Sequence, residues 1–242
     1  MWLNPGNRTK GLAVYLHGGA YATGPNTAQW RWLDAVTKAS STAGVLVDYR
    51  LSGQAPYPAA LNDVVTALEA LDDRRALDTG WVLAGDSAGG GLAVSTCERL
   101  VGVQRLAANL RGLILMSPWL DLDVPAQSSD SVDDIDPILQ RKALRRAARK
   151  YAGCTPLATP ELSPINARLD QIPKTYLSVG TRDILLSDAR RLRQRLIDCR
   201  TELEYYEQPG GLHVFPMMSW EPGSRRCLEG QISFMRQVMA HR

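Results

Sequence analysis

The sequence predicts an α/β fold whose mostly parallel sheet is flanked by helices. Short apolar runs alternate with segments of helical periodicity along the chain, which is the pattern of parallel strands joined by crossover helices. The chain has 242 residues, of which 45% are hydrophobic and 22% charged, a balance typical of an ordinary globular protein. We therefore expect a single domain over residues 1–242.

The apolar runs predict the strands, because each is as short as a buried parallel strand. They lie at 12–16, 44–48, 81–84, 112–116, 175–179 and 203–206. Amphipathic spacing predicts helices near 27–39, 59–72, 88–101, 137–151, 188–198 and 224–240. Asp136 before Pro137 predicts the start of the fourth helix, because an N-cap aspartate followed by proline is a common helix start.

The alternation breaks between residues 119 and 170, where aspartates, prolines and one basic helix accumulate. An insertion over the carboxyl ends of the strands would have this composition, so we expect a cap-like segment at 119–170. The basic residues of 141–150 recur at helical spacing and predict one charged helix face. A solvated face is the ordinary interpretation of such a run, and a rim that attracts acids is the alternative.

Charge and composition argue against several functions. A formal net charge of +3 is too small to indicate a nucleic-acid partner or an anionic membrane. The N-terminus lacks the apolar core of a signal peptide, and no apolar run approaches the about 18 residues of a membrane span. We therefore expect a cytoplasmic protein without membrane insertion. The four cysteines form no C-x-x-C pair, so we expect reduced thiols, no metal site and no cofactor.

Residues 82–95, "VLAGDSAGGGLAVS", place Ser87 at a predicted strand-to-helix turn among glycines and alanine. Residues 85–89 fit G-x-S-x-G, in which a nucleophilic serine occupies a strained turn and small neighbours let strand and helix approach. The turn exposes the serine oxygen at a helix N-terminus, where free N–H groups favour negative charge. A glycine-rich tight turn or a phosphate-binding loop is the alternative, although neither G-x-G-x-x-G nor G-K-[ST] occurs here.

A serine nucleophile needs a base, and histidine is the usual one near neutral pH. Of the three histidines, His241 is the penultimate residue and His17 ends the first predicted strand. His213 lies in a loop after the last strand, and loops at the carboxyl ends of strands carry chemistry in such folds. His213 is therefore the predicted base.

The base needs a carboxylate that holds its tautomer. Asp183 follows strand 175–179 and precedes a helix, so it is the predicted orienting acid, with a plain turn aspartate as the alternative. Asp188 lies at the start of the helical run and is predicted to cap it, so that asparagine there should cost about 1 kcal/mol of stability or less. The order Ser87, Asp183, His213 is the order of nucleophile, acid and base in α/β-hydrolases.

Further motifs extend this order along the chain. "HGGA" at 17–20 matches H-G-G-G in three of four positions, and "GDSAGG" contains the serine. "DYRLSGQAPYPAALND", "SPWLDL", "GTRDIL" and "GLHVF" are the remaining motifs. In sequence and order these segments resemble the hormone-sensitive-lipase-like (family IV) esterases of the α/β-hydrolase superfamily.

The resemblance implies an α/β-hydrolase fold and a role for each site residue. Ser87 is the implied nucleophile, His213 the base and Asp183 the orienting acid. The implied oxyanion-hole donors are the N–H groups of Gly18, Gly19 and Ala88. His17 is implied to be structural, bracing the glycine loop.

The chain departs from the family pattern in three places. Ala20 replaces the third glycine, and "LSGQ" replaces L-A-P-E. Only 16 residues precede the HGGA motif, so we expect the first strand of the family's sheet and most of its N-terminal cap to be absent. We then expect residues 119–170 and the loop with Met217, Met218 and Trp220 to cover the substrate pocket in place of the missing N-terminal cap.

The motifs and the resemblance predict a serine carboxylic ester hydrolase that works through an acyl-enzyme. The resemblance implies small esters with short acyl chains as substrates and a homodimer as a possible assembly. An amidase, a deacetylase or a lactonase would use the same triad, and the sequence leaves these open. The alternative from another class is a non-catalytic ligand-binding relative, which a replaced histidine would favour.

Overall fold

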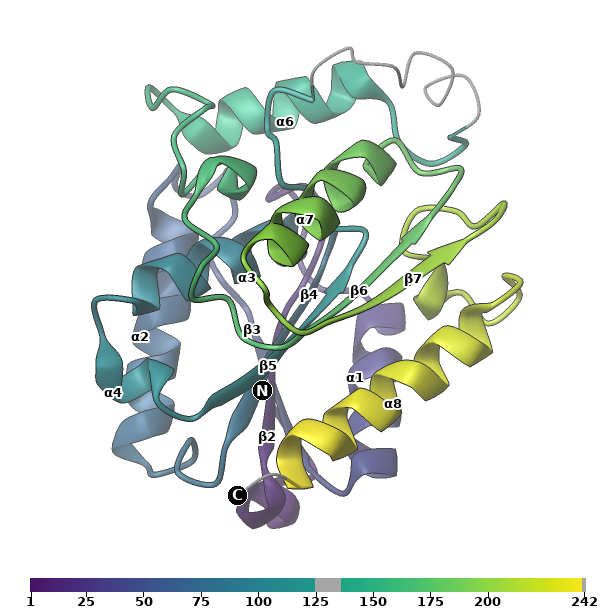
Figure 1. The fold of residues 1–242 in the computed structure, drawn as a ribbon. Coiled ribbons are helices and arrows are strands. Elements are labelled where there is room, and N and C mark those ends of the chain that lie inside the picture. The colour runs from purple at the N-terminus through teal and green to yellow at the C-terminus, as the bar shows by residue number, and fades with distance from the viewer. Residues whose placement is uncertain (125–135, 241–242) are drawn as a thin grey trace.

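One seven-stranded sheet organises the computed structural model, which describes residues 1–124 and 136–240 (Figure 1). The strands are β1 (Trp2–Leu3), β2 (Leu12–Leu16), β3 (Ala43–Val47), β4 (Trp81–Asp86), β5 (Leu110–Met116), β6 (Thr175–Gly180) and β7 (Leu203–Gln208). Their order across the sheet is β1-β3-β2-β4-β5-β6-β7, and every neighbouring pair except β1 and β3 is parallel. The predicted α/β fold class is confirmed.

Helices cover both faces of this sheet, so the central strands are buried on two sides. The helices are α1 (Thr27–Ser40), α2 (Ala59–Asp73), α3 (Ser87–Leu100), α4 (Gln104–Ala107), α6 (Arg141–Ala152), α7 (Leu186–Asp198) and α8 (Ser224–Ala240), with short 3-10 turns η1 (Pro5–Lys10), η2 (Pro164–Asn166) and η3 (Phe215–Met217). Helices α1 and α8 lie side by side on one face, and α2, α3 and α7 pack against the other (Figure 1). Burial on both faces explains why β2, β3 and β4 are near-continuous apolar runs.

All six predicted strands are present, but the edge strand β1 was not predicted. Trp2 and Leu3 pair with Val45 and Gly44 of β3 in antiparallel register. A strand of two residues is too short to show any periodicity in the sequence, so pattern analysis has nothing to detect there. The chain therefore adds an antiparallel edge beside β3.

The fourth predicted helix begins at Arg141 rather than at 137. Asp136 does cap a turn, because its Oδ1 accepts hydrogen bonds from the backbone N–H of Ile138 (2.8 Å) and Leu139 (2.9 Å). Its Oδ2, however, accepts from the N–H of Ile184 (2.8 Å), so the carboxylate joins this turn to the loop after β6. The prediction of a helix start at Asp136 is wrong, because the turn that Asp136 caps does not continue as a helix and α6 begins only at Arg141.

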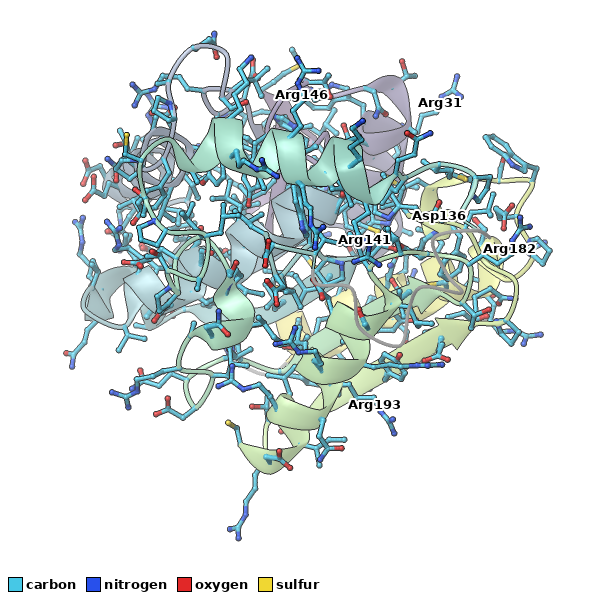
Figure 2. All side chains as sticks on the ribbon, turned by 90° about the horizontal axis from the view of Figure 1, so that it is seen from above. Arg31, Asp136, Arg141, Arg146, Arg182 and Arg193 are labelled. Atoms are coloured by element: carbon cyan, nitrogen blue, oxygen red, sulfur yellow. The ribbon has the colours of Figure 1, made fainter. Side chains whose placement is uncertain are left out.

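Helix α6 has the two faces that the sequence predicts. Leu144, Ala148 and Tyr151 are buried, and Tyr151 stacks on Tyr21 after β2 with ring centroids 3.7 Å apart. The basic side chains on the opposite face are exposed: Lys142, Arg146, Arg149 and Lys150. Seen from above in Figure 2, α6, with Arg141 and Arg146 labelled, crosses the molecule over the strand ends. In the described ranges, no helix is long and apolar enough to cross a membrane.

Candidate active site

Ser87 occupies a strained turn between β4 and α3. It is the first residue of α3, directly after the last residue of β4, and its φ is 51°, in the left-handed region that non-glycine residues rarely adopt. Its side chain is buried, with 6% of the residue exposed. This is the geometry that G-x-S-x-G predicts, since the sharp turn presents the hydroxyl at a helix N-terminus.

The small neighbours of Ser87 are required by close packing. A Cβ on Gly85 would lie 2.3 Å from the carbonyl oxygen of Gly89, so the strand and the first turn of α3 are nearly in contact. A Cβ on Gly89 would lie 2.1 Å from the carbonyl oxygen of Leu16, at the end of β2. Only glycine lets these three backbone segments approach so closely.

His213 and Asp183 are in direct contact at the carboxyl end of the sheet. The Nδ1 atom of His213 lies 2.9 Å from Oδ2 of Asp183, and both residues are buried, with 5% and 0% exposed. Because a carboxylate only accepts, Nδ1 carries the proton and Nε2 is left as the free acceptor of the neutral ring. The second oxygen of Asp183 accepts from the N–H of Leu185 (2.9 Å), which fixes the carboxylate in place.

The surroundings of His213 favour its protonated form. Burial lowers the pKa of this imidazole, but the charge and hydrogen bond of Asp183, together with smaller contributions from Asp136 and Asp86, outweigh burial. The pKa of His213 is therefore raised above its ordinary value. An imidazole with this environment is a better proton acceptor than a free one.

The structure does not join Ser87 to His213 directly. In the described part of the chain, the Ser87 hydroxyl makes no hydrogen bond to the imidazole. Catalytic hydrogen bonds are often long before substrate binds, so this spacing is compatible with a serine–histidine pair. The loop after β5 contacts both neighbourhoods, since Trp119 N–H donates to the Ser87 carbonyl (2.9 Å) and Val214 N–H donates to Ser117 Oγ (3.1 Å).

Asp86, which the sequence analysis did not single out, is the polar centre of the site. Its buried carboxylate accepts hydrogen bonds from the Tyr15 hydroxyl, from the Gly18 N–H (2.7 Å) and from Gln29 Nε2 (3.1 Å to each oxygen). Burial, and then the charge of Asp86, raise the pKa of Tyr15 far above its ordinary range, so this phenol stays a donor. An aspartate inside an apolar run could have revealed this role, because a buried carboxylate needs partners.

Gln29 is held at both ends of its amide. Its Oε1 accepts from the N–H of Asn26 (2.8 Å), while Asn26 Oδ1 accepts from the N–H of Ala28 and Gln29, which forms the capping box of α1. With Oε1 committed to the cap, Nε2 points to Asp86. The start of α1 is thereby tied to the turn that carries Ser87.

The contact with Asp86 corrects one of the expected oxyanion donors. The N–H of Gly18 already donates to Asp86, so it is not free to bind an oxyanion. Gly19 and Ala20 follow with φ of 115° and 53°, and their N–H groups meet no acceptor among the described residues. The same holds for Ala88, in the first turn of α3, where helical N–H groups lack partners.

His17 packs inside the protein beneath the glycine loop. Its Nδ1 lies 2.8 Å from the carbonyl oxygen of Gly18, and its ring stacks on Tyr49 with centroids 4.2 Å apart. Burial lowers the pKa of His17, against smaller raising effects from the Gly18 carbonyl and Asp86, so the ring is neutral near pH 7. These contacts agree with a structural role.

Asp188 does not cap α7, contrary to the expectation from its position. It is the third residue of the helix and is buried, and its side chain points to the loop after β5. There its Oδ2 accepts from the N–H groups of Leu120 (3.0 Å) and Asp121 (2.9 Å). The expectation failed because helix spacing cannot reveal that another segment packs on this face.

A cavity of about 790 Å³ adjoins the site. It reaches Asp86 and Val214, the neighbours of Ser87 and His213 in the sequence. Its walls are mostly apolar and include Trp32, Pro216, Met217, Met218, Trp220 and Leu228. Exposed Arg31, labelled in Figure 2, also lines it. Cavities of this size and character hold small organic ligands.

Comparison with known proteins identifies the family. A family model described as "alpha/beta hydrolase fold" matches residues 13–217. An acetyl-hydrolase of Streptomyces hygroscopicus is 32% identical over 97% of this chain and 78% of its own, and an esterase of Acinetobacter venetianus is 28% identical over 90% and 72%. A crystal structure of an esterase from the bacterial hormone-sensitive lipase family superposes with a TM-score of 0.91 at 27% identity, covering 98% of this chain and 80% of that one.

The family match spans most of the chain and coincides with the strained serine turn and the histidine–aspartate pair. The curated relatives are named as hydrolases of esters or acetyl groups, and the structural neighbours are bacterial esterases. The chain therefore belongs to the α/β-hydrolase family, among its carboxylesterase-type enzymes related to hormone-sensitive lipase.

Proposed function

We propose that the protein hydrolyses small carboxylic esters through an acyl-enzyme on Ser87, with His213 as base and Asp183 as the acid that orients it. The contact that carries this proposal is the buried pair of His213 Nδ1 and Asp183 Oδ2 at 2.9 Å. It leaves Nε2 as the free basic atom at the strand ends where the serine turn also lies. A pair of this kind, beside a strained nucleophile turn, is the arrangement that serine hydrolases use.

The reaction follows from these positions. Ser87 Oγ attacks the ester carbonyl while His213 Nε2 takes the hydroxyl proton, and Asp183 stabilises the imidazolium. Collapse of the tetrahedral intermediate breaks the ester bond, and the imidazolium returns the proton to the departing alcohol. Water then attacks the acyl-serine with the same base, which releases the carboxylic acid and restores Ser87.

The oxyanion is proposed to bind the N–H groups of Gly19, Ala20 and Ala88, with Gly18 replaced by Ala20 because its own N–H is occupied. The positive φ angles of Gly19 and Ala20 turn the loop just after β2. Donors on this loop and on the first turn of α3 can face one point, and such fixed donors stabilise developing negative charge. Gly18 then supports the hole through Asp86.

The proposed substrates are esters with short acyl chains, and the relatives named as acetyl-hydrolase and esterase support this class. We also propose that residues 119–124 and 136–170, which include α6, act as a cap over the site, and that the apolar loop after His213 supplies the remaining cover. Residues 125–135 of the expected cap segment lie outside the described residues. Pairing of two copies is a further proposal, which light scattering of the purified protein tests.

Covalent labelling tests the chemistry directly. A fluorophosphonate should label the wild type at Ser87, and Ser87→Ala should abolish both labelling and turnover of p-nitrophenyl acetate, a loss on the order of 10⁴- to 10⁶-fold. A circular dichroism melt should show that the variant is still folded. Turnover within tenfold of wild type would place the nucleophile elsewhere. Matched amide, lactone and ester substrates distinguish the esterase from the hydrolases that would use the same triad.

A further inference from the structure

Asp188 is a buried carboxylate that the proposed reaction does not use. It lies on α7, which begins three residues after Asp183, and only 4% of it is exposed. One of its oxygens, Oδ2, accepts two backbone hydrogen bonds from consecutive residues, Leu120 (3.0 Å) and Asp121 (2.9 Å). Two backbone donors on one buried carboxylate oxygen hold that stretch of chain tightly against the helix.

The stretch that Asp188 holds is the loop of residues 117–123, which contacts both sides of the candidate site. Trp119 N–H donates to the carbonyl oxygen of Ser87 (2.9 Å). Ser117 Oγ accepts from the N–H of Val214 (3.1 Å), the residue after His213. The loop therefore lies between the serine turn and the histidine loop and bonds to the backbone of each.

We propose that Asp188 is a positioning residue, which anchors the loop of residues 117–123 to α7 and thereby sets Ser87 relative to His213. The proposal rests on the function proposed above. Asp183 lies just before α7, so the hydrogen bonds of Asp188 attach this loop to the same helix that follows the proposed orienting acid. A shift of the loop would change the distance between nucleophile and base without touching either side chain, and small misplacements of reacting groups are costly in rate.

The charge of Asp188 is sensitive to pH near neutrality. The pKa of this carboxyl is raised to about 7, because burial and, to a smaller extent, the charge of Asp121 outweigh the two backbone hydrogen bonds and the charge of Arg191, which lower it. Among the described residues, the charged side chains that act on it are those of Asp121 and Arg191, which pair with each other at 2.9 Å. As pH falls through this range, the acceptor of the two loop N–H groups becomes neutral and holds them less strongly.

Two variants of Asp188 and one control separate positioning from a structural role. Asp188→Ala removes the acceptor, whereas Asp188→Asn keeps an acceptor oxygen without the charge. Asp198→Ala removes an exposed acid on the same helix, which accepts from Gln194 (2.8 Å). With p-nitrophenyl acetate, Asp188→Ala should lower kcat about 10- to 100-fold with KM within about threefold, and Asp188→Asn should recover most of that loss. Asp198→Ala should match wild type.

The pH profile gives a second readout that folding alone would not move. In wild type, the acid limb of log kcat should show the His213 ionisation and a further shallow fall as Asp188 becomes neutral, down to the level of Asp188→Asn, whereas in Asp188→Asn only the His213 ionisation should remain. Asp188→Ala leaves two buried N–H groups without an acceptor, so this variant should be less stable than wild type. Circular dichroism melts of each variant therefore give the temperature at which kcat is measured on folded protein. If Asp188→Ala does not fold at any temperature, Asp188→Asn and its pH profile decide alone.

Failure of the proposal is distinct from failure of the proposed function. A wild-type protein that a fluorophosphonate does not label at Ser87 would refute the esterase mechanism itself. If wild type is labelled and both folded Asp188 variants are labelled at the wild-type rate with unchanged kcat, Asp188 does not position the site. A loss that appears in KM alone, or an unchanged pH profile in Asp188→Asn, would equally overturn the proposal.

Discussion

At the scale of single residues, Asp86 connects parts of the chain that the serine motif alone does not mention. The motif predicts Ser87 and its glycines, whereas Asp86 stands at its variable position. The carboxylate joins Tyr15 of β2, the Gly18 N–H and Gln29 of α1 to the residue next to the proposed nucleophile. We infer that Asp86 keeps the glycine loop in the conformation that leaves the following N–H groups free.

Replacing Asp86 by asparagine should therefore impair catalysis more than folding. The amide has one acceptor oxygen, so one of the present donors must face its NH₂ group. We expect kcat for p-nitrophenyl acetate to fall about 10- to 100-fold with KM little changed, and the free energy of unfolding to fall by about 1–3 kcal/mol. As a control, Asp63→Asn breaks the surface ion pair with Arg50 (2.7 Å) and should leave kcat unchanged. A kcat of Asp86→Asn within twofold of wild type would contradict this role.

The pKa of His213 should report its contact with Asp183. Asp183 provides the largest effect that raises this pKa, and burial opposes it, so Asp183→Asn should lower the midpoint of the His213 titration. The raised pKa also means that protonation of His213 stabilises the fold below its unfolded pKa, a contribution lost as pH rises through the folded value. Proton NMR titration of the imidazole measures the midpoint, and His17 serves as the internal control. A His213 midpoint equal to that of wild type would contradict the assigned contact.

At the scale of elements, the approach of α3 to the ends of β2 and β4 is what brings Ser87 to the glycine loop. The contact depends on glycines on both sides of the serine, because any Cβ there would meet a backbone carbonyl. The short distance between α3 and the ends of β2 and β4 therefore depends on these glycines in the sequence.

Gly89→Ala should disrupt this contact, since its Cβ would lie 2.1 Å from the Leu16 oxygen and 2.6 Å from the His17 oxygen. Backbone atoms cannot move aside as a flexible side chain can, so we expect a loss of about 3 kcal/mol or more in the free energy of unfolding. Gly102→Ala, whose Cβ meets nothing within 4 Å, should change stability by less than about 1 kcal/mol. Urea denaturation of both variants tests the pair, and equal stabilities would show that α3 can yield.

The regular helices and strands could be predicted from the sequence because each has its own periodicity. The hydrogen bonds that hold the site's loops in place could not be predicted. Strand β1 has two residues and no pattern, and nothing in the local sequence shows that the turn at Asp136 ends before α6 begins at Arg141. Asp188 looked like a cap because its loop partners lie 67 and 68 residues away in the chain. Gly18 was expected to bind the oxyanion because nothing in the motif shows that Asp86 occupies its N–H. Long-range polar contacts leave no local spacing to detect.

At the scale of the whole molecule, we infer that the cavity beside the site would receive the acyl chain of the proposed ester substrates. Its wall includes the loop with Met217, Met218 and Trp220, and Trp220 is 76% exposed. Thioether side chains adapt to different shapes, and an exposed wall excludes water poorly. We therefore expect the apolar wall of this cavity to discriminate poorly between acyl chains of different length.

We therefore expect high KM values and little discrimination among acyl chains. A well-buried methylene adds up to about 0.8 kcal/mol of binding, which a partly open cavity should not provide. The measurement is kcat/KM from acetate to decanoate at a fixed leaving group, where neighbouring lengths should differ by less than about tenfold and those beyond about six carbons hardly at all. A steep optimum would mean that residues 119–124 and 136–170, or a second subunit, enclose the acyl chain.

The hydrogen bonds of Asp86 have a thermal consequence. They bind together a central strand, the glycine loop and a surface helix, so none of these can detach without breaking a buried polar contact. We therefore expect the glycine loop to belong to the same cooperative unit as the sheet and to have no low-temperature opening of its own. On heating, esterase activity should vanish at the temperature where the far-ultraviolet circular dichroism of the sheet melts. Inactivation well below that temperature would show that the loop unfolds independently.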